Sequence, residues 1–228
     1  MANLPAPVNR VVLPWFPAIL LARNPGVGRR RGCAGALSIA GVHIMVFASS
    51  GRVMITEADL PSADEREAAL VARLEALGIA FVTHTHAPVF TVEEAAALRG
   101  NLPGGHTKNL FLKDKRDALW LVVAREDLRL DLNGLSKQLG SPRFSFGPAE
   151  LLIETLGIAP GSVTPFSLMN DTEGKVRCVL DAGMMAFDPL NFHPLRNDRT
   201  TALSPDSLVR FIHDTGHEPL IAALPERA

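Results

Sequence analysis

The chain has 228 residues, of which 47% are hydrophobic and 21% are charged, and its formal net charge is −1. A chain of this length can build one domain with a substantial core, and sometimes two. The composition excludes a wholly disordered chain, and the near-neutral charge argues against a protein that binds nucleic acid along a broad surface.

The first fifty-odd residues differ in character from the rest. Residues 1–56 hold six arginines and no acidic residue, so residues 57–228 carry a net charge of −7. Prolines and glycines interrupt the segment, and no helical or strand period runs through it. We expect residues 1–52 to be a disordered lead or an overextended reading frame, and residues 53–228 to form the functional domain.

The two cysteines, Cys33 and Cys178, match neither a metal-binding spacing nor a disulfide framework. Cys178 lies in an apolar run typical of a strand, where a small thiol is normally buried. We therefore expect a reducing, cytoplasmic setting. The apolar runs are too short to cross a bilayer, so we expect no membrane association.

The first elements expected after the lead are a helix and a strand. Ser62 or Asp64 can cap a helix that carries an apolar stripe and ends before Gly78. A strand is expected over 79–83. Thr91, with a glutamate three residues later, forms a capping box, which predicts a short helix to about residue 98.

Two apolar strands, 109–113 and 119–124, flank a polar turn and predict a β-hairpin. The later elements follow in chain order: a helix over 132–139, a helix from Pro148 to about 157, a strand over 176–181, a short strand over 200–203, and a helix capped by Ser204 with Pro205 in its first position. This irregular order predicts an α/β fold with a mixed, partly antiparallel sheet flanked by helices.

The most distinctive stretch is Gly104-Gly105-His106-Thr107-Lys108-Asn109-Leu110-Phe111-Leu112, a glycine turn that leads a lysine and an asparagine into an apolar strand. Glycines let the backbone approach a ligand closely. The stretch is no phosphate-binding Walker loop, because the Gly-x-x-x-x-Gly-Lys-Ser/Thr pattern is missing. Two weaker islands follow, Gly161-Ser162-Val163-Thr164-Pro165 and Asn191-Phe192-His193-Pro194-Leu195.

Together the three islands resemble the YbaK/ProX family of freestanding aminoacyl-tRNA editing domains, over residues 55–224. The nearest branch hydrolyses alanine misattached to proline tRNA. The resemblance implies a single α/β editing domain without metal or cofactor. Its expected partner is the acceptor end of a mischarged tRNA, with prolyl-tRNA synthetase as a further candidate.

The resemblance also implies roles for single residues. Lys108 would bind phosphate or ester oxygens beside the terminal adenosine, and Asn109 would place its amide on the ribose or the carbonyl. The loop over 161–164 would offer backbone N–H groups to the oxyanion, whereas Pro165 has none to offer. His193 would face the aminoacyl group and crowd side chains larger than a methyl group.

A geometric condition accompanies the first two assignments. Neighbouring side chains of an extended segment face opposite sides, so Lys108 and Asn109 can share a pocket only at a strand end or a bend. The apolar walls of such a pocket are expected from four residues: Phe90, Leu110, Phe166 and Leu168.

A zinc site is not expected. His84, His86 and His106 alternate in a way that could place them on one face, but no glutamate or cysteine completes a ligand set. A serine hydrolase is also disfavoured, because the chain has no Gly-x-Ser-x-Gly elbow. No strong general base is evident, and in the resembled family the neighbouring ribose hydroxyl is thought to assist the attacking water.

Two other functions stay open from the sequence. One is editing of another amino acid, such as serine, cysteine or threonine, because sequence reports pocket shape poorly. The other is a non-catalytic nucleic-acid-binding or regulatory module that uses the arginine-rich lead as an arm.

Overall fold

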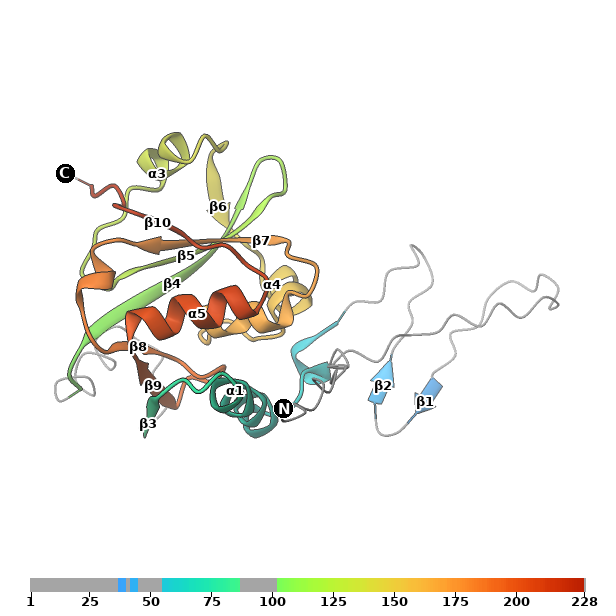
Figure 1. The fold of residues 1–228 in the computed structure, drawn as a ribbon. Coiled ribbons are helices and arrows are strands. Elements are labelled where there is room, and N and C mark those ends of the chain that lie inside the picture. Colours follow the sequence, from blue (N-terminus) through green and yellow to red (C-terminus); the bar gives the residue numbers. More distant parts are fainter. Residues whose placement is uncertain (1–36, 40–41, 45–54, 87–101, 228) are drawn as a thin grey trace, which may run out of the picture. The chain divides into compact units, whose positions relative to one another are not determined.

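The computed structural model describes residues 37–39, 42–44, 55–86 and 102–227 (Figure 1). The helices are α1 (Ala63–Ala76), α3 (Leu132–Gln138), α4 (Ala149–Leu156) and α5 (Pro205–Asp214), with 3-10 turns at Glu57–Asp59, Pro165–Asn170 and Met184–Ala186. The strands are β1 (Leu37–Ile39), β2 (Val42–Ile44), β3 (Phe81–Thr85), β4 (Gly105–Asp114), β5 (Leu119–Arg125), β6 (Phe144–Phe146), β7 (Val176–Asp181), β8 (Leu190–Phe192), β9 (Arg199–Leu203) and β10 (Leu220–Ala222).

The main sheet is mixed. Its strands follow the order β10-β7-β5-β4-β8-β9-β3, and β6 pairs with β4 outside this path. The β4–β5, β4–β6, β8–β9 and β3–β9 pairs are antiparallel, whereas β5–β7, β7–β10 and β4–β8 are parallel. Strands β1 and β2 form a separate antiparallel ladder. The predicted α/β fold with a mixed, partly antiparallel sheet is confirmed.

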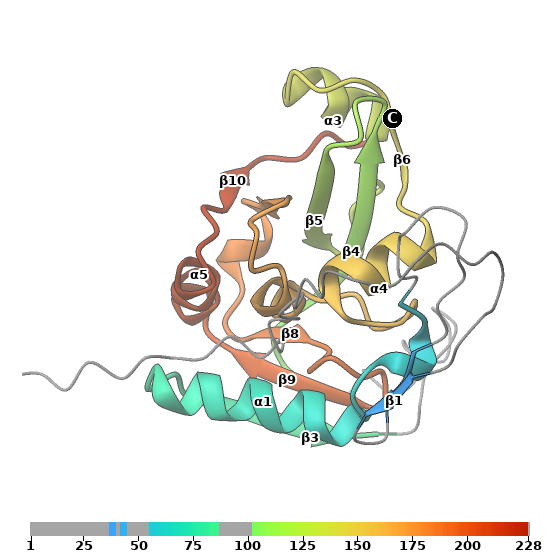
Figure 2. The ribbon, with the colours of Figure 1, turned by 90° about the vertical axis from the view of Figure 1, so that its right-hand side faces the viewer.

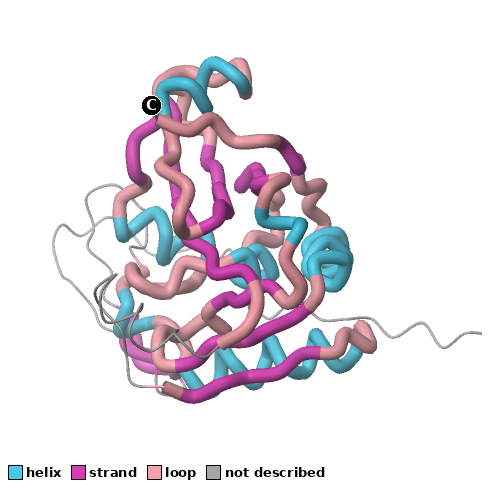
Figure 3. Tube along the Cα trace, turned by 90° about the vertical axis from the view of Figure 1, so that its left-hand side faces the viewer, coloured by secondary structure: helices cyan, strands magenta, loops and turns pink. Residues whose placement is uncertain are grey.

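Both faces of the sheet are buried at its centre. On one face, Leu121 and Val123 of β5 join a large cluster with residues of α1, α4 and α5. On the other face, Trp120 and Val122 join a smaller cluster with Leu135 of α3. The apolar run of β5 is therefore continuous because both sides of the strand are covered. Figure 2 shows α1 running alongside β3 and β9, and Figure 3 shows the same interleaving of helices and strands from the opposite side.

Most predicted elements occur, with shifted ends. Helix α1 begins after Ser62, whose hydroxyl accepts from the backbone N–H of Glu65. Strand β3 starts two residues later than expected, and β4 starts four residues earlier, at Gly105. Pro148 is the N-cap of α4 rather than its first residue. The helix expected after Thr91 lies outside the described residues. Strands β6, β8 and β10, with three residues each, were not predicted.

The turn into β4 depends on Gly104. Its φ is +102°, and a Cβ at this position would lie 2.1 Å from the carbonyl oxygen of Pro189. The buried Asn191 holds the same turn, since its Nδ2 donates to the carbonyls of Pro103 at 3.0 Å and Gly105 at 3.4 Å. A glycine is required here both for the backbone conformation and for the space.

A buried acid ties the 3-10 turn before β7 to the chain after α5. The Asp171 carboxylate accepts from the backbone N–H groups of Lys175 at 3.1 Å and Val176 at 2.7 Å, and lies 3.0 Å from Nε2 of His217. Burial by itself raises the pKa of Asp171, but the hydrogen bonds from His217, Val176 and Lys175 outweigh it and leave that pKa below its ordinary value.

We expect Asp171→Asn to lower the free energy of unfolding by about 2 kcal/mol at pH 7, because hydrogen bonds to a charged group are lost in the core. Because the folded pKa is depressed, the Asp171 contribution is present above the unfolded pKa near 4 and is lost as the pH falls through the lower folded pKa. Urea unfolding between pH 3 and 7 should therefore show a flatter acid limb for the variant. Equal slopes for the two proteins would contradict this account.

Candidate functional site

Strand β4 is paired unequally on its two edges. Along one edge it pairs with β5 from Thr107 to Lys113 without a bulge. Along the other edge it pairs with β8 only at Gly105 and His106, and with β6 only from Leu112 onward. Between these ends, no strand of the described residues covers β4 at positions 107–111.

The hydrogen bonds at both ends of β4 show which backbone groups face this gap. The backbone carbonyl of His106 accepts from the N–H of Glu126, and the N–H of Asp114 donates to the Ala118 carbonyl, both at 3.0 Å. The backbone groups of even-numbered positions in β4 therefore point toward β5. Gly105 donates to the Pro189 carbonyl at 2.8 Å, and Phe111 accepts from Gly147 N at 2.9 Å, so odd-numbered positions bond toward the other edge. The backbone N–H and C=O of Asn109 therefore point into the gap.

A pocket of about 350 Å³ opens at this gap. Its lining comes from β4, from the chain between β6 and the first turns of α4, and from the loop after α4; the lining residues are Asn109, Leu110, Phe111, Phe146, Gly147, Ala149, Leu152, Pro160, Gly161 and Val163. The size lies in the range of small-molecule sites. Most of the lining is apolar, with Asn109 and backbone groups supplying the polar part.

Asn109 is the main polar group in this pocket. Its side-chain Oδ1 is buried and has no hydrogen-bond partner among the described residues. A buried acceptor of this kind costs free energy unless something pairs with it. Together with its backbone N–H and C=O, Asn109 can offer both donors and acceptors to a ligand seated in the gap.

The structure does not bring Lys108 into the same pocket. Position 108 lies within the regular part of β4, so its side chain points to the face opposite Asn109. There Nζ donates to the carbonyls of Glu126, at 3.0 Å, and Leu128. Burial lowers the pKa of Lys108, while the negative charges of Asp127 and Glu226 act in the opposite direction. An ammonium has three N–H donors, so these two bonds leave one for another acceptor.

The loop over 161–165 contributes only part of itself to the pocket. Gly161 and Val163 line it, and Gly161 has a φ of +88° in open space, where an added Cβ would meet nothing within 4 Å. The N–H of Ser162 is used within the turn, where it donates to the Ala159 carbonyl at 3.2 Å. Thr164 and Pro165 instead begin the 3-10 turn, with the Thr164 hydroxyl as its cap. The two positions that reach the pocket are therefore Gly161 and Val163.

His193 lies just after β8, on the same edge of β4. Its Nδ1 is 3.1 Å from the Arg199 carbonyl oxygen, and its ring centroid is 6.4 Å from that of His86. His86 in turn has Nε2 at 2.9 Å from the hydroxyl of Thr200. The imidazole of His193 is thus oriented by the first residue of β9.

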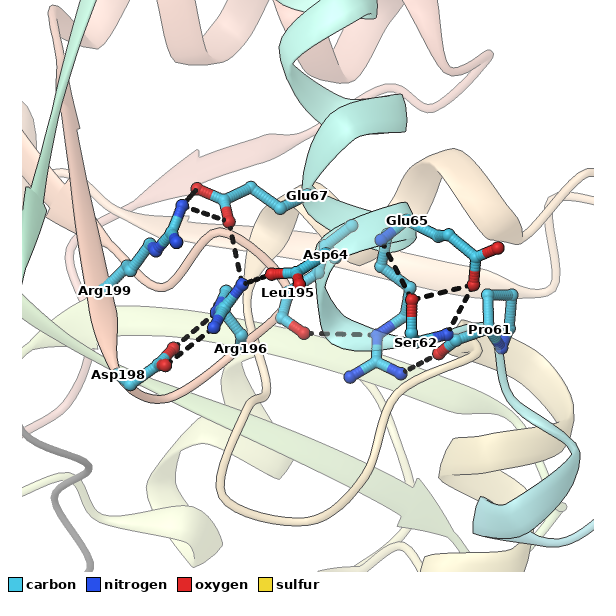
Figure 4. A network of polar contacts seen from close by, with 10 residues as sticks. Pro61, Ser62, Asp64, Glu65, Glu67, Leu195, Arg196, Asp198 and Arg199 are labelled. Carbon is cyan, nitrogen blue, oxygen red and sulfur yellow. Dashed lines mark hydrogen bonds and ion pairs between the residues drawn. The ribbon is translucent and has the colours of Figure 1, made fainter.

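An ion-pair network fixes that part of β9 (Figure 4). Glu67 of α1 accepts from Nη1 of Arg199 at 2.7 and 2.8 Å and from Nη1 of Arg196 at 3.1 Å. Hydrogen bonds to the carboxylate of Asp198 hold the pKa of Arg196 above its ordinary value, with Asp64 adding to the effect. Glu67 is only 7% exposed, and these guanidinium groups offset the cost of burying its carboxylate.

Several of the predicted pocket walls lie elsewhere. Leu110 lines the pocket, but Phe166 and Leu168 are fully buried in the larger core cluster and do not, so their assignment as walls was wrong. Phe90 lies outside the described residues. Within the described ranges, no group of three histidine, cysteine or acidic side chains is placed to hold a metal ion.

Three residues of this region were missed from the sequence. Phe146 and Gly147 line the pocket, and the Phe144-Ser145-Phe146 alternation before Gly147 is the signal for a short strand. Glu67 falls on the apolar stripe of α1 with Leu70 and Leu74. A charge on a buried helical face is the signal for a buried partner.

Comparison with known proteins places this geometry in a family. The model of the aminoacyl-tRNA editing domain matches residues 86–211, a range that contains β4, β6, α4 and β8. The chain belongs to the aminoacyl-tRNA editing domain family. The YbaK/ProX resemblance inferred from the three motifs is thereby confirmed.

The match to relatives in this family extends over most of each relative's length. Prolyl-tRNA synthetase associated domain-containing protein 1 of Bos taurus is 41% identical over 162 residues, which span 69% of this chain and 94% of that protein. Prolyl-tRNA editing protein ProX of Acetoanaerobium sticklandii is 32% identical over 150 residues, or 65% of this chain and 92% of the relative.

A solved structure shares the fold. It is described as a candidate trans-editing enzyme for prolyl tRNA synthetase, and it superposes with a TM-score of 0.57 at 22% sequence identity, over 73% of this chain and 100% of that one. Among the described residues of this editing domain, no helix has the length and apolarity needed to span a membrane.

We expect Glu67→Gln to lower the free energy of unfolding by about 3 kcal/mol, because two guanidinium groups lose a buried charged partner. The matched control is Asp64→Asn on the same helix. Asp64 pairs with Arg196 too, but its side chain is 83% exposed, so less than about 1 kcal/mol should be lost. Urea denaturation followed by circular dichroism measures both, and equal losses would show that burial of Glu67 is not what matters.

Proposed function

We propose that this editing domain is a hydrolase that removes a wrongly attached amino acid from tRNA, and that alanyl-tRNA(Pro) is its substrate. The observation that carries the proposal is the pocket at the interrupted edge of β4, where Asn109 presents a backbone N–H, a carbonyl and an unpartnered amide oxygen. An ester with its ribose hydroxyls needs both donors and acceptors of this kind. The names of the Bos taurus and Acetoanaerobium sticklandii relatives support a link to prolyl-tRNA synthetase.

The chemistry asked of the site is modest. Water adds to the ester carbonyl, the bond between that carbon and the ribose oxygen breaks, and the ribose oxygen takes a proton. The products are the free amino acid and a tRNA with a free terminal hydroxyl. Backbone N–H groups of Asn109, Gly161 and Val163 are the candidate donors for the oxyanion that develops on the carbonyl. Holding ester and water together supplies the rest of the acceleration.

Lys108 enters the proposal in a different way from the sequence-based assignment. Its bonds to the Glu126 and Leu128 carbonyls hold the chain that follows β5. Because Lys108 faces away from the pocket, we assign its third N–H to a phosphate oxygen of the acceptor end outside the pocket, not to the ester. His193, oriented by the Arg199 carbonyl, does not line this pocket, and its role as the group that limits the size of the amino acid rests on the sequence motif alone.

Selectivity against larger amino acids follows from volume. A synthetase pocket built for proline cannot exclude alanine by size, because a missing methylene is worth only about 1–3 kcal/mol. A second pocket that admits a methyl group and excludes a proline ring corrects the error. The partner implied by this reaction is the acceptor end of the tRNA, with prolyl-tRNA synthetase as a candidate second component and no cofactor required.

A panel of purified esters tests the proposal. We expect rapid deacylation of alanyl-tRNA(Pro), slower deacylation of seryl- and cysteinyl-tRNA, and no action on prolyl-tRNA(Pro). Lys108→Ala should reduce kcat/KM at least about tenfold, because a charged donor is lost. Preferred cleavage of the seryl or cysteinyl ester would assign the neighbouring specificity, and binding without any cleavage would assign a non-catalytic module.

The role of Asn109 has its own test. Asn109→Ala keeps the backbone N–H and removes only the side-chain amide, so kcat for alanyl-tRNA(Pro) should fall about tenfold, as expected for one lost hydrogen bond to the bound ester or ribose. Lys113→Ala on the same strand is the control, because its amine pairs with Asp117 at 2.6 Å and lies outside the pocket. Single-turnover deacylation separates the two variants, and an unchanged rate in Asn109→Ala would remove the Asn109 side chain from the reaction.

A further inference from the structure

We propose that Phe146 is a stacking platform for the base of the nucleotide that carries the amino acid. The inference rests on the proposed function, and it adds to that function a nucleobase subsite at the mouth of the pocket. It explains a side chain that the fold leaves in water although it is large and apolar.

The exposure of Phe146 is unusual within the described part of the chain. Its side chain is 67% exposed, the highest value among the exposed large hydrophobic residues, which are Val82, Phe146, Phe187, Leu220 and Ile221. Of this set, only Phe146 lines the pocket. Scattered exposed apolar residues need no explanation, but an aromatic ring at the mouth of a pocket does.

The ring sits on a well-held backbone. Phe146 pairs with Leu112 of β4, and Gly147 N donates to the Phe111 carbonyl at 2.9 Å. Two residues earlier, Phe144 is buried against Trp120 with ring centroids 5.5 Å apart. Strand β6 is therefore anchored on both sides of Ser145, and the exposure of Phe146 is not the result of a loose segment.

The surroundings of Phe146 suit a flat base. The pocket that Phe146 lines has mostly apolar walls, which include Leu110, Leu152 and Val163. A Cβ at Gly147 would lie 2.4 Å from the Phe111 ring, so glycine lets the backbone that follows Phe146 pass close to that ring. The polar edge of Asn109 lies in the same pocket. A base that stacks on an aromatic ring, with its sugar near hydrogen-bonding groups, is the usual arrangement for single-stranded nucleic acid.

Exposed basic side chains lie beyond Phe146, on the side of β6 away from the pocket. Arg143, the residue before β6, is exposed and lies about 10 Å along the chain from Phe146 at a rise near 3.3 Å per residue. The register of β6 with β4 sets Phe144 opposite Asp114, next to the turn that carries the exposed Lys115 and Arg116. Asp117 in that turn pairs with Lys113. The remaining cations suit the phosphates that precede the terminal nucleotide.

Steady-state kinetics with alanyl-tRNA(Pro) tests the subsite. Phe146→Ala and Phe146→Leu should each raise KM about thirtyfold, which is the middle of the range for one stacked base, with kcat within about twofold. Phe146→Tyr and Phe146→Trp should keep the wild-type KM because they retain a ring. Phe187→Ala, which removes another exposed aromatic ring that does not line the pocket, should leave both parameters unchanged. A wild-type KM in Phe146→Leu would overturn the stacking proposal.

A binding measurement separates failure of this inference from failure of the proposed function. Two probes are used. The first is 3′-deoxy-3′-(alanylamino)adenosine, whose amide cannot be hydrolysed as an ester, and the second is the same compound without the adenine base. The fluorescence of the Phe146→Trp protein should be quenched by the first compound and not by the second, relative to the wild-type background. Equal responses to both compounds would overturn the subsite even if wild-type protein deacylates tRNA. Quenching without any deacylation would keep the subsite and remove the proposed reaction.

Discussion

The architecture of the site depends on one strand that is paired fully on one edge and only at its ends on the other. Strand β4 uses its even-numbered backbone groups against β5 and its odd-numbered groups against β8 and β6. Between the end of β8 and the start of β6, the backbone N–H and C=O of Asn109 face a pocket. Unpaired strand edges invite pairing with another chain or ligand, so the sheet itself provides the polar part of the site.

The same two-residue period divides the glycine-lysine-asparagine motif into two tasks. Asn109 faces the pocket and the larger core cluster, whereas Lys108 faces the smaller cluster and binds carbonyls beyond the end of β5. Burial of the charged amine in this position lowers its pKa, and the carbonyl bonds offset the cost of that burial. The side chains that flank one peptide bond thus act on different faces of one sheet.

Long-range pairs hold the remaining parts of the site in place. Glu67 on α1 binds Arg199, 132 residues later, and the carbonyl of Arg199 orients the imidazole of His193. The pocket at the open edge of β4 is bounded by the start of α4 and by the loop after α4. The net charge of −7 over residues 57–228 argues against a broad phosphate-binding surface on the domain.

The sequence determined the local elements and the family. The cap at Ser62, the β4–β5 hairpin, β7 and the Ser204–Pro205 start of α5 are encoded by residues close together in the chain, and the three motifs were enough to indicate an editing domain. Only the tertiary structure decided the three-residue strands β6, β8 and β10, because strands this short gain their hydrogen bonds from distant partners rather than from their own propensity. It also decided which motif residues meet. Lys108 and Asn109 lie on opposite faces of the sheet, as neighbours in a strand do. Phe166 and Leu168 are buried in the core whereas Phe146 is exposed, because burial depends on what packs across the sheet and not on the residue type alone.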